Sequence, residues 1–223
     1  MSDVLGARSL HGRVRTQWQA KLWVGALLTA LFLGGYFTAQ RVTLREPFAV
    51  PTTALDDWIG FNPAWVYAYQ SLYALLPVAW LAGSREELRR YIQGFLIVSI
   101  TGLLCFVLFP TTVPRPTVVG DPVPLYRLLI DYDRPLNCLP SLHVALAIYS
   151  TCFAATVFPN RWTRWSLVAW CLLISYATLA IKQHVLLDVL AGVAVGWMGH
   201  SVAWRRPPVP RQAMRFAANG EPA

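Results

Sequence analysis

The sequence predicts an all-α fold, a polytopic membrane bundle of six transmembrane helices with both termini in the cytoplasm. Of its 223 residues, 56% are hydrophobic and only 13% are charged, whereas about a quarter of the residues are charged in an average soluble domain. Apolar segments of roughly 20 residues, the length of helix that crosses a hydrocarbon layer of about 30 Å, recur along the chain. Composition and spacing therefore both indicate a protein that crosses the bilayer several times.

Six apolar runs, each bounded by charged or turn-forming residues, are the expected helices. The first follows a basic stretch, as in a signal peptide, but it leads to Arg41 and not to a small-residue cleavage site, so we expect it to be retained. The sixth carries Asp188 in its first turns, and an acid inside a span is costly enough to be a candidate for function. The six runs are Leu22–Gln40, Pro63–Ala82, Tyr91–Phe109, Ser141–Phe158, Trp165–Ile181 and His184–Trp204.

The basic residues predict which side of the membrane each connection faces. With the N-terminus inside, 13 of the 19 Lys and Arg residues fall on cytoplasmic segments and the other six on the opposite side, as the positive-inside rule requires. We therefore expect a cytoplasmic segment over 1–21, the six-helix domain over 22–204 and a poorly ordered cytoplasmic tail over 205–223. The short turn Pro159–Trp162 predicts that the fourth and fifth helices are antiparallel neighbours.

The remaining composition excludes several kinds of protein. The net charge of +8 does not indicate nucleic-acid binding, because the basic residues are scattered between apolar runs and form no continuous patch. Three of the four cysteines lie inside apolar runs and only Cys138 lies in a polar loop, so a disulfide framework is not expected. No ligand spacing favours a metal. We expect no metal, no cofactor and no obligate protein partner, only the lipid bilayer.

Three polar stretches, at 109–116, 138–143 and 182–188, are not explained by hydropathy. His143 and His184 are 41 residues apart, which is about two membrane crossings, so both lie on the non-cytoplasmic side. Arg115 reaches the same side from the end of the third helix. Asp133, in the loop between the first two stretches, is expected to be a solvated loop charge. The topology thus brings two histidines, an arginine and Asp188 to one membrane face.

Each stretch allows a chemical role and a structural one. His184 and Asp188 are spaced i, i+4, so the carboxylate can hold one imidazole nitrogen and stabilise the cation that forms if the other nitrogen attacks phosphorus. Ser141, after Pro140, marks a helix start whose free amides suit a phosphate, with His143 in the first turn. Arg115 can donate two hydrogen bonds to phosphate. Alternatively, the His–Asp pair is a structural hydrogen bond, Ser141 only a helix cap, and Arg115 a headgroup anchor.

Taken together, Pro-Arg115-Pro116, Pro140-Ser141-Leu142-His143 and His184-Val-Leu-Leu-Asp188 resemble the three motifs of the type 2 phosphatidic acid phosphatase superfamily. The resemblance implies that His184 is the nucleophile, that Asp188 orients it and that His143 protonates the leaving alcohol. Arg115 and Ser141, with backbone amides around Leu142, would hold the phosphate, and no metal is needed. The resemblance also implies a membrane lipid phosphate as substrate, cleaved by way of a phosphohistidine at the non-cytoplasmic face. A bacterial inner membrane, with the site facing the periplasm or exterior, is the expected location.

The departures from the family pattern keep other activities open. The family usually has a Lys where this chain has Leu108, and Ser-Arg where it has Ala177 and Thr178. Lys182 could replace one missing phosphate-binding cation. In these losses, and in having Leu142 inside the second motif, the sequence resembles the branch that includes inositol phosphorylceramide and sphingomyelin synthases. These enzymes are transferases. Because Arg115 is retained, we predict a hydrolase first, a headgroup phosphotransferase second and a non-catalytic lipid-binding protein third.

Overall fold

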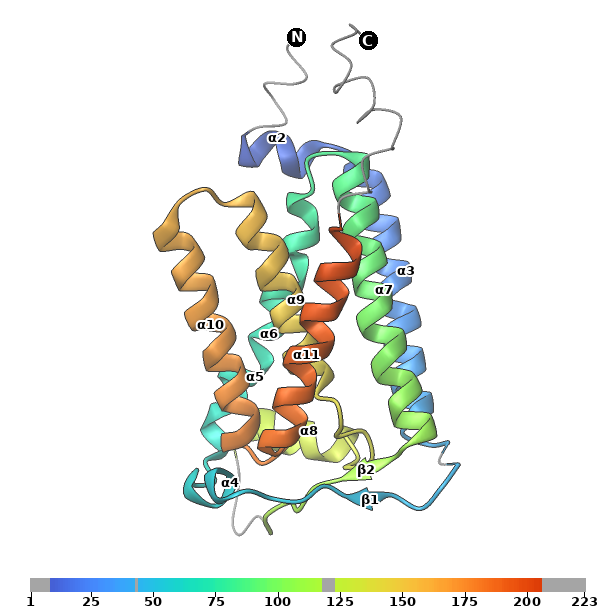
Figure 1. Cartoon of the computed structure of the whole chain (residues 1–223), viewed down its shortest axis with the longest axis vertical. Helices are drawn as coiled ribbons and strands as arrows, with labels where there is room; N and C mark the ends of the chain where they lie inside the picture. Colours follow the sequence, from blue (N-terminus) through green and yellow to red (C-terminus); the bar gives the residue numbers. More distant parts are fainter. Residues whose placement is uncertain (1–8, 43, 118–122, 206–223) are drawn as a thin grey trace, which may run out of the picture.

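The computed structural model describes residues 9–42, 44–117 and 123–205 and is mostly helical (Figure 1). Long helices run side by side, and short elements close both ends of the bundle. The predicted tail, apart from Arg205, and the first eight residues of the predicted N-terminal segment lie outside the described residues. The helices are α2 (Leu10–Arg15), α3 (Trp18–Ala39), α4 (Ala54–Trp58), α5 (Val66–Gln70), α6 (Leu72–Leu75), α7 (Arg85–Leu108), α8 (Pro124–Tyr132), α9 (Leu142–Val157), α10 (Arg161–Ala180) and α11 (Leu186–Ala203), with 3-10 helices η1 (Pro63–Trp65) and η2 (Leu76–Leu81).

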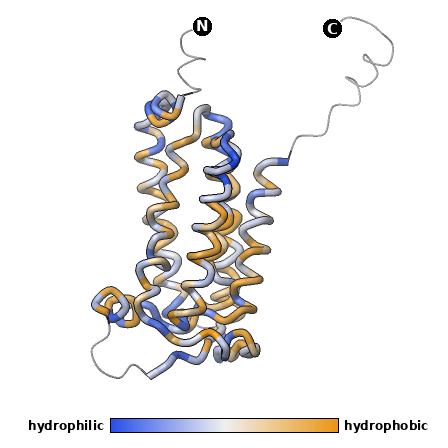
Figure 2. Tube along the Cα trace, turned by 90° about the vertical axis from the view of Figure 1, so that its left-hand side faces the viewer, coloured by the Kyte–Doolittle hydropathy of each residue, from blue (hydrophilic) through white to orange (hydrophobic). Residues whose placement is uncertain are grey.

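Three of the described helices, α3, α7 and α11, are long and apolar enough to cross a membrane. Figure 2 shows hydrophobic residues along the long helices of the bundle. The helix α9 is also apolar, but it has 16 residues. The start of α2 and the end of α11 lie at one end of the bundle, and α4 and α8 lie at the other (Figure 1). The six-span layout and the cytoplasmic termini stay predictions.

The predicted helix Pro63–Ala82 is not continuous, but a rod of short pieces: η1, α5, α6 and η2. Ser71 separates α5 from α6, and its hydroxyl donates to the carbonyl of Ala68 at 2.6 Å, a local bond that competes with regular helix geometry. Pro77 lies at the start of η2 and has no N–H to donate. Hydropathy detects the apolar run but not these interruptions.

Helix caps move several boundaries away from the predicted ones. The helix α7 begins six residues before the predicted Tyr91, because the Ser84 side chain accepts from the backbone amide of Glu87 and starts the helix in polar sequence. Asn160 caps α10 in the same way. Ser141 is the N-cap of α9, as predicted, and its hydroxyl accepts from the Val144 amide at 3.4 Å. Polar first turns are invisible to hydropathy, whereas a cap residue identifies them.

The helix α9 forms the centre of the bundle, and α10 returns beside it as the predicted antiparallel neighbour (Figure 1). The helices α9 and α11 approach closely, because two glycines of α11 face the α9 backbone. A Cβ atom added at Gly192 would lie 2.5 Å from the carbonyl oxygen of Ser141, and one added at Gly196 would collide with the carbonyl oxygen of Ala145. Small residues at such crossings allow two membrane helices to approach backbone to backbone.

The end of the bundle that carries α4 and α8 is closed by a short parallel sheet. The strand β1 (Phe48–Ala49) pairs with β2 (Thr111–Thr112), and Thr111 also forms a bridge with Asn137. The Thr111 hydroxyl accepts from the Leu139 amide at 2.8 Å, just before α9. The loops that contain the first two polar stretches are therefore tied to each other beneath the helix ends.

Candidate active site

His184 and Asp188 form the pair that their spacing predicts. His184 lies in the turn before α11 and is 8% exposed, and Asp188, in the first turn, is fully buried. The imidazole Nδ1 lies 3.3 Å from Asp188 Oδ2, which also accepts from the Val185 amide at 3.1 Å. Because a carboxylate only accepts, Nδ1 carries the proton and Nε2 is left with its lone pair. The second carboxylate oxygen, Oδ1, has no partner among the described residues.

His143, in the first turn of α9, is held by the rod of short helices. Its Nε2 lies 2.8 Å from the backbone carbonyl of Tyr69, which can only accept, so this nitrogen is the donor. Its ring stacks on the Tyr69 ring with centroids 3.6 Å apart and meets the Tyr73 ring edge-on at 6.0 Å. The other ring nitrogen, Nδ1, is therefore the one that can exchange a proton with a bound molecule.

Ser141 and Leu142 connect the two histidines through the backbone. Both are buried, and the Ser141 amide donates to the carbonyl of Asp188 at 3.0 Å. This bond joins the start of α9 to the start of α11, so His143 and His184 are placed by one junction. Both histidines line the same cavity. The predicted roles of Ser141 and Leu142 in phosphate binding stay predictions.

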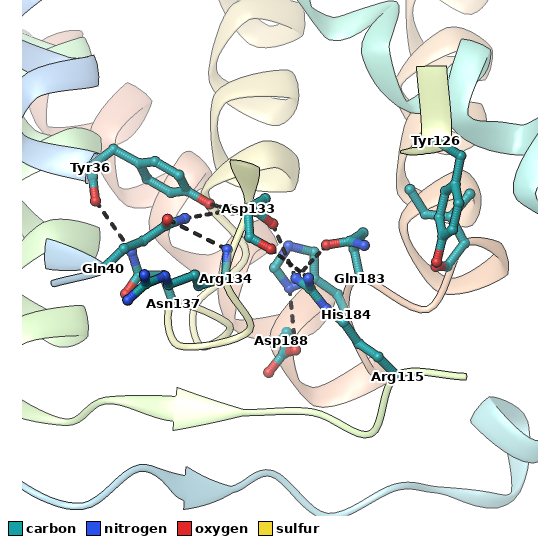
Figure 3. Close-up of polar contacts among 11 residues, drawn as sticks. Tyr36, Gln40, Arg115, Tyr126, Asp133, Arg134, Asn137, Gln183, His184 and Asp188 are labelled. Carbon is teal, nitrogen blue, oxygen red and sulfur yellow. Dashed lines mark hydrogen bonds and ion pairs between the residues drawn. The ribbon is translucent and has the colours of Figure 1, made fainter. Parts of the chain in front are cut away.

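Arg115 lies beside His184, but its guanidinium is already engaged (Figure 3). Nη1 donates to the backbone carbonyl of Asp133 at 2.5 Å, and Nη2 donates to Asp133 Oδ2 at 3.1 Å and to Gln183 Oε1 at 2.5 Å. Nε has no partner among the described residues. The structure thus brings Arg115 to the predicted site and pairs its charge with an internal carboxylate.

The expectation that Asp133 is a solvated loop charge is wrong. Its side chain is 16% exposed, and besides Arg115 it accepts from the Tyr36 hydroxyl at 2.5 Å and from Gln40 Nε2 at 2.6 Å. Asp133 follows the end of α8, whereas Tyr36 and Gln40 lie at the end of α3. The carboxylate is therefore stable in a largely shielded position, because a cation and two neutral donors, contributed by distant segments, satisfy it.

Lys182 lies next to the site in sequence, yet its ammonium group is used elsewhere. The residue has a φ of 57°, and its Nζ donates to the backbone carbonyls of Asp56 and Ile59 at 2.5 and 2.6 Å. Asp56 in turn caps α11, since its Oδ1 accepts from the Leu186 amide at 2.8 Å. Its other oxygen accepts from the Thr53 amide and hydroxyl. Lys182 and Asp56 thus fix the turn that carries His184 against α4, and phosphate binding by Lys182 stays a prediction.

A long apolar cavity of about 940 Å³ opens beside the two histidines. Its walls are α3, the rod of short helices, α7 and the first two turns of α9, and its polar end contains His143, His184 and Asp133. The lining of α3 extends from Tyr36 back to Lys21, which is about 22 Å at 1.5 Å per residue. That length exceeds the half-thickness of a bilayer, about 15 Å.

Two further observations limit the chemistry of the site. The described residues contain no group of three or more His, Cys, Asp or Glu side chains placed to hold a metal ion. Cys138 lies in the loop before α9 and is buried, and burial raises the pKa of its thiol to about 12. It is therefore protonated at neutral pH and is a poor nucleophile, because the thiolate is the reactive form.

Three residues that hold the site together were not predicted as site residues: Asp56, Asp133 and Gln183. Each contacts residues that are distant in sequence, from 68 positions for Gln183 and Arg115 to 130 positions for Asp56 and Leu186. Thr53 and Asp56 form a capping box that their spacing alone could have indicated. The contact of Asp56 with α11 has no sequence signal of that kind. Gln183 was detectable only as a polar residue next to His184.

The family comparison agrees with the motifs. A family model described as the PAP2 superfamily matches residues 42–202, more than half of the chain, and this range includes every predicted site residue. No curated protein and no solved structure matches the chain at a significant level. The match confirms the resemblance to the type 2 phosphatidic acid phosphatase superfamily.

Proposed function

Because the chain belongs to the PAP2 superfamily, whose activities are phosphatase and phosphotransferase reactions, we propose that it is a membrane lipid phosphatase. It hydrolyses a phosphate monoester or pyrophosphate of a lipid through a phosphohistidine intermediate. The observation that carries this proposal is the position of the His184–Asp188 pair and His143 at the polar end of a long apolar cavity. A phosphate bound there has a nucleophile and an acid beside it and room for a lipid chain behind it.

The two ring tautomers support the following order of steps. His184 Nε2 attacks phosphorus, and the bond from phosphorus to the leaving oxygen breaks. The charge that appears on the imidazole is stabilised by Asp188 through Nδ1–H. His143 donates its Nδ1 proton to the leaving alcohol from the doubly protonated ring, a state that the negative charge of the bound phosphate favours, while Nε2–H stays on the Tyr69 carbonyl. Water then attacks the phosphohistidine, His143 takes the proton from that water, and inorganic phosphate leaves with His184 restored.

The cavity supports a lipid as the substrate. Pockets for small ligands measure about 300–1,000 Å³ and are mostly apolar with few polar groups, and this one has both histidines and Asp133 at one end. A soluble phosphate ester would leave the apolar part unfilled, whereas a hydrocarbon chain fills it. The length along α3 suits a chain that reaches past the middle of the bilayer.

The proposal includes a placement in the membrane. Three apolar helices fit membrane association, and members of this family are typically membrane proteins. We place α2, with Arg13 and Arg15, on the cytoplasmic side and the site on the opposite side, so that six segments span a bacterial inner membrane as a multi-pass protein. The partners are then the lipid phosphate and the bilayer, with no nucleic acid and no obligate protein.

The proposal is tested with purified protein and a panel of lipid phosphates: phosphatidic acid, lysophosphatidic acid, a phosphatidylglycerol phosphate and a polyprenyl pyrophosphate. We expect inorganic phosphate from at least one of them, and an acid-labile radiolabel on the wild type that is absent from His184→Ala. Asp188→Asn should retain the fold and reduce turnover by orders of magnitude. Phosphate release that persists in both variants, or a panel without any release, would falsify the proposal. An absent radiolabel together with an absent product would favour a non-catalytic lipid-binding protein.

One observation favours a second candidate, a lipid headgroup phosphotransferase. The Arg115 charge is balanced by Asp133, the Lys182 ammonium is bound to backbone carbonyls, and Leu108 and Thr178 supply no charge. A site with so little positive charge suits a phosphodiester, with one negative charge, better than a doubly charged monoester. This activity would convert a donor lipid and an acceptor alcohol into a new phospholipid without free phosphate. Product that forms equally without acceptor contradicts it.

A further inference from the structure

Gln183, the residue before His184, has a buried donor without a partner. The side chain is 2% exposed, and its Oε1 accepts from Arg115 Nη2 at 2.5 Å. A guanidinium has only donors, so this contact fixes which end of the amide faces Arg115. The NH2 end is therefore directed away from Arg115, and Nε2 has no hydrogen-bond partner among the described residues.

Arg115 presents a second donor of the same kind. Its Nε is buried and also lacks a partner among the described residues, although both terminal nitrogens are bonded. An unpaired buried donor is unfavourable, and native proteins leave few of them. Here two donors occur on two side chains that are bonded to each other, beside the nucleophile candidate. Both side chains lie next to His184 (Figure 3), and a phosphate oxygen is an acceptor that can satisfy such a donor.

We propose that Gln183 is a phosphate-binding residue, which donates Nε2–H to one non-bridging oxygen while Arg115 Nε–H donates to another. This inference rests on the proposed function. It supplies the hydrogen bonds that the cations missing at Leu108 and Thr178 would otherwise provide, but without their charge. The phosphate is then bound mainly by hydrogen bonds from well-placed donors, and Arg115 is the one residue of the pair that contributes a positive charge. The neutral amide of Gln183 donates where Lys182 does not, because the Lys182 ammonium is bound to backbone carbonyls.

The test uses Gln183→Glu, which keeps the shape of the side chain and its contact with Arg115 but replaces the donor by an acceptor with a negative charge. Inhibition by inorganic phosphate and by orthovanadate is measured together with kcat and KM. We expect the inhibition constants to rise by about tenfold to a hundredfold. Gln19→Glu adds the same charge at an exposed position at the start of α3, outside the predicted span, and should change the inhibition constants less than twofold. An unchanged inhibition constant in Gln183→Glu overturns the inference.

Gln183→Met provides a variant that removes the amide without adding charge, should the glutamate variant fail to fold. It is expected to raise the same constants by about tenfold. The thermal stabilisation of the detergent-solubilised protein by orthovanadate separates this inference from the proposed function, because it needs no turnover. Stabilisation of the wild type but not of Gln183→Met supports the inference even if no substrate is hydrolysed. Equal stabilisation of both, or none of the wild type, contradicts it.

Discussion

The two sides of the bundle are built in opposite ways. On one side α9 and α11 touch backbone to backbone at Gly192 and Gly196, and they carry the histidines. On the other side α3 is separated from α9 by the cavity, and an added Cβ atom at Gly25, which lines the cavity, would meet nothing within 4 Å. The difference suggests a division of tasks, in which close packing fixes the positions of reacting groups and loose packing leaves room for a molecule.

The hollow side is nevertheless fixed at both ends. Near the start of α3, the Lys21 ammonium donates to the backbone carbonyls of Arg13 and Trp80 at 2.6 and 2.8 Å. At its end, Tyr36 and Gln40 bind Asp133. Between these points, α3 packs against α7, where the Phe32 and Phe95 rings meet edge-on with centroids 6.1 Å apart. Polar contacts at both ends and packing against α7 thus hold α3 beside the cavity.

The largest effect is expected from a substitution that separates α9 from α11. In Gly192→Ala, the new Cβ would lie 2.5 Å from the Ser141 carbonyl, so the two helices must separate near Asp188. A displacement of about 1 Å in an active site can reduce the rate by about a hundredfold, and we expect a loss of that size and a lower melting temperature in detergent. Gly34→Ala on α3 is the matched control and should keep full activity. Equal activity of the two variants would show that close approach is not required.

A smaller effect is expected from removing the contact between Asp56 and the turn before α11. Asp56→Ala removes the acceptor of the Leu186 amide, a loss of about 1 kcal/mol for a helix cap, and also releases Thr53. We expect about tenfold slower turnover and a modest decrease in melting temperature. Asp57→Ala, at the exposed neighbouring position, is the control. If both alanine variants behave alike, the α4 contact does not position His184.

A smaller effect, which depends on the length of the substrate chain, is expected from narrowing the cavity beside α3. Thr29→Phe places a ring in the cavity wall about halfway along α3, so kcat/KM should fall several-fold for long-chain substrates and little for short-chain ones. Leu27→Phe points away from the cavity lining and should affect neither. Assays with a series of chain lengths measure this. A uniform loss for all lengths would mean that the cavity does not hold the chain.

The smallest effect is expected from thiol reagents. Because burial raises the pKa of Cys138 to about 12, its folded-state pKa lies well above the usual value of about 8.5, and the reactive thiolate is absent at pH 8. Native protein treated with a maleimide at this pH should keep its activity within about twofold and show no label at Cys138 by mass spectrometry. Protein unfolded in detergent should be labelled rapidly. Fast native labelling would indicate that the loop before α9 opens.

Local patterns predicted what lies within one helix or one turn. The spacing of His184 and Asp188 gave their contact, and Ser141 after Pro140 gave the start of α9. The interruptions at Ser71 and Pro77 and the direction of the Lys182 side chain were not predicted. The reason is physical: hydropathy averages over a segment, whereas a left-handed residue such as Lys182 redirects one side chain according to contacts with residues far away in sequence.

The carboxylate of Asp133 shows the same limit. Asp133 in a loop sequence has every sign of a solvated charge, and only the meeting of Arg115, Tyr36 and Gln40 around it makes burial favourable. Those three residues come from two segments that are about 75 positions apart in the chain. A prediction from spacing cannot find a partner set that is assembled by the fold.

The position of the cavity has an energetic consequence for catalysis. Moving a hydrocarbon chain from the bilayer into water costs about 0.8 kcal/mol per methylene group, or roughly 13 kcal/mol for a chain of about sixteen carbons. A binding site reached only through water would add this amount to every turnover. The cavity lies along α3, at the depth of the hydrocarbon layer in the proposed orientation. A lipid can therefore enter laterally from the bilayer, with its chain remaining in an apolar environment. Only its headgroup then needs to exchange water for protein.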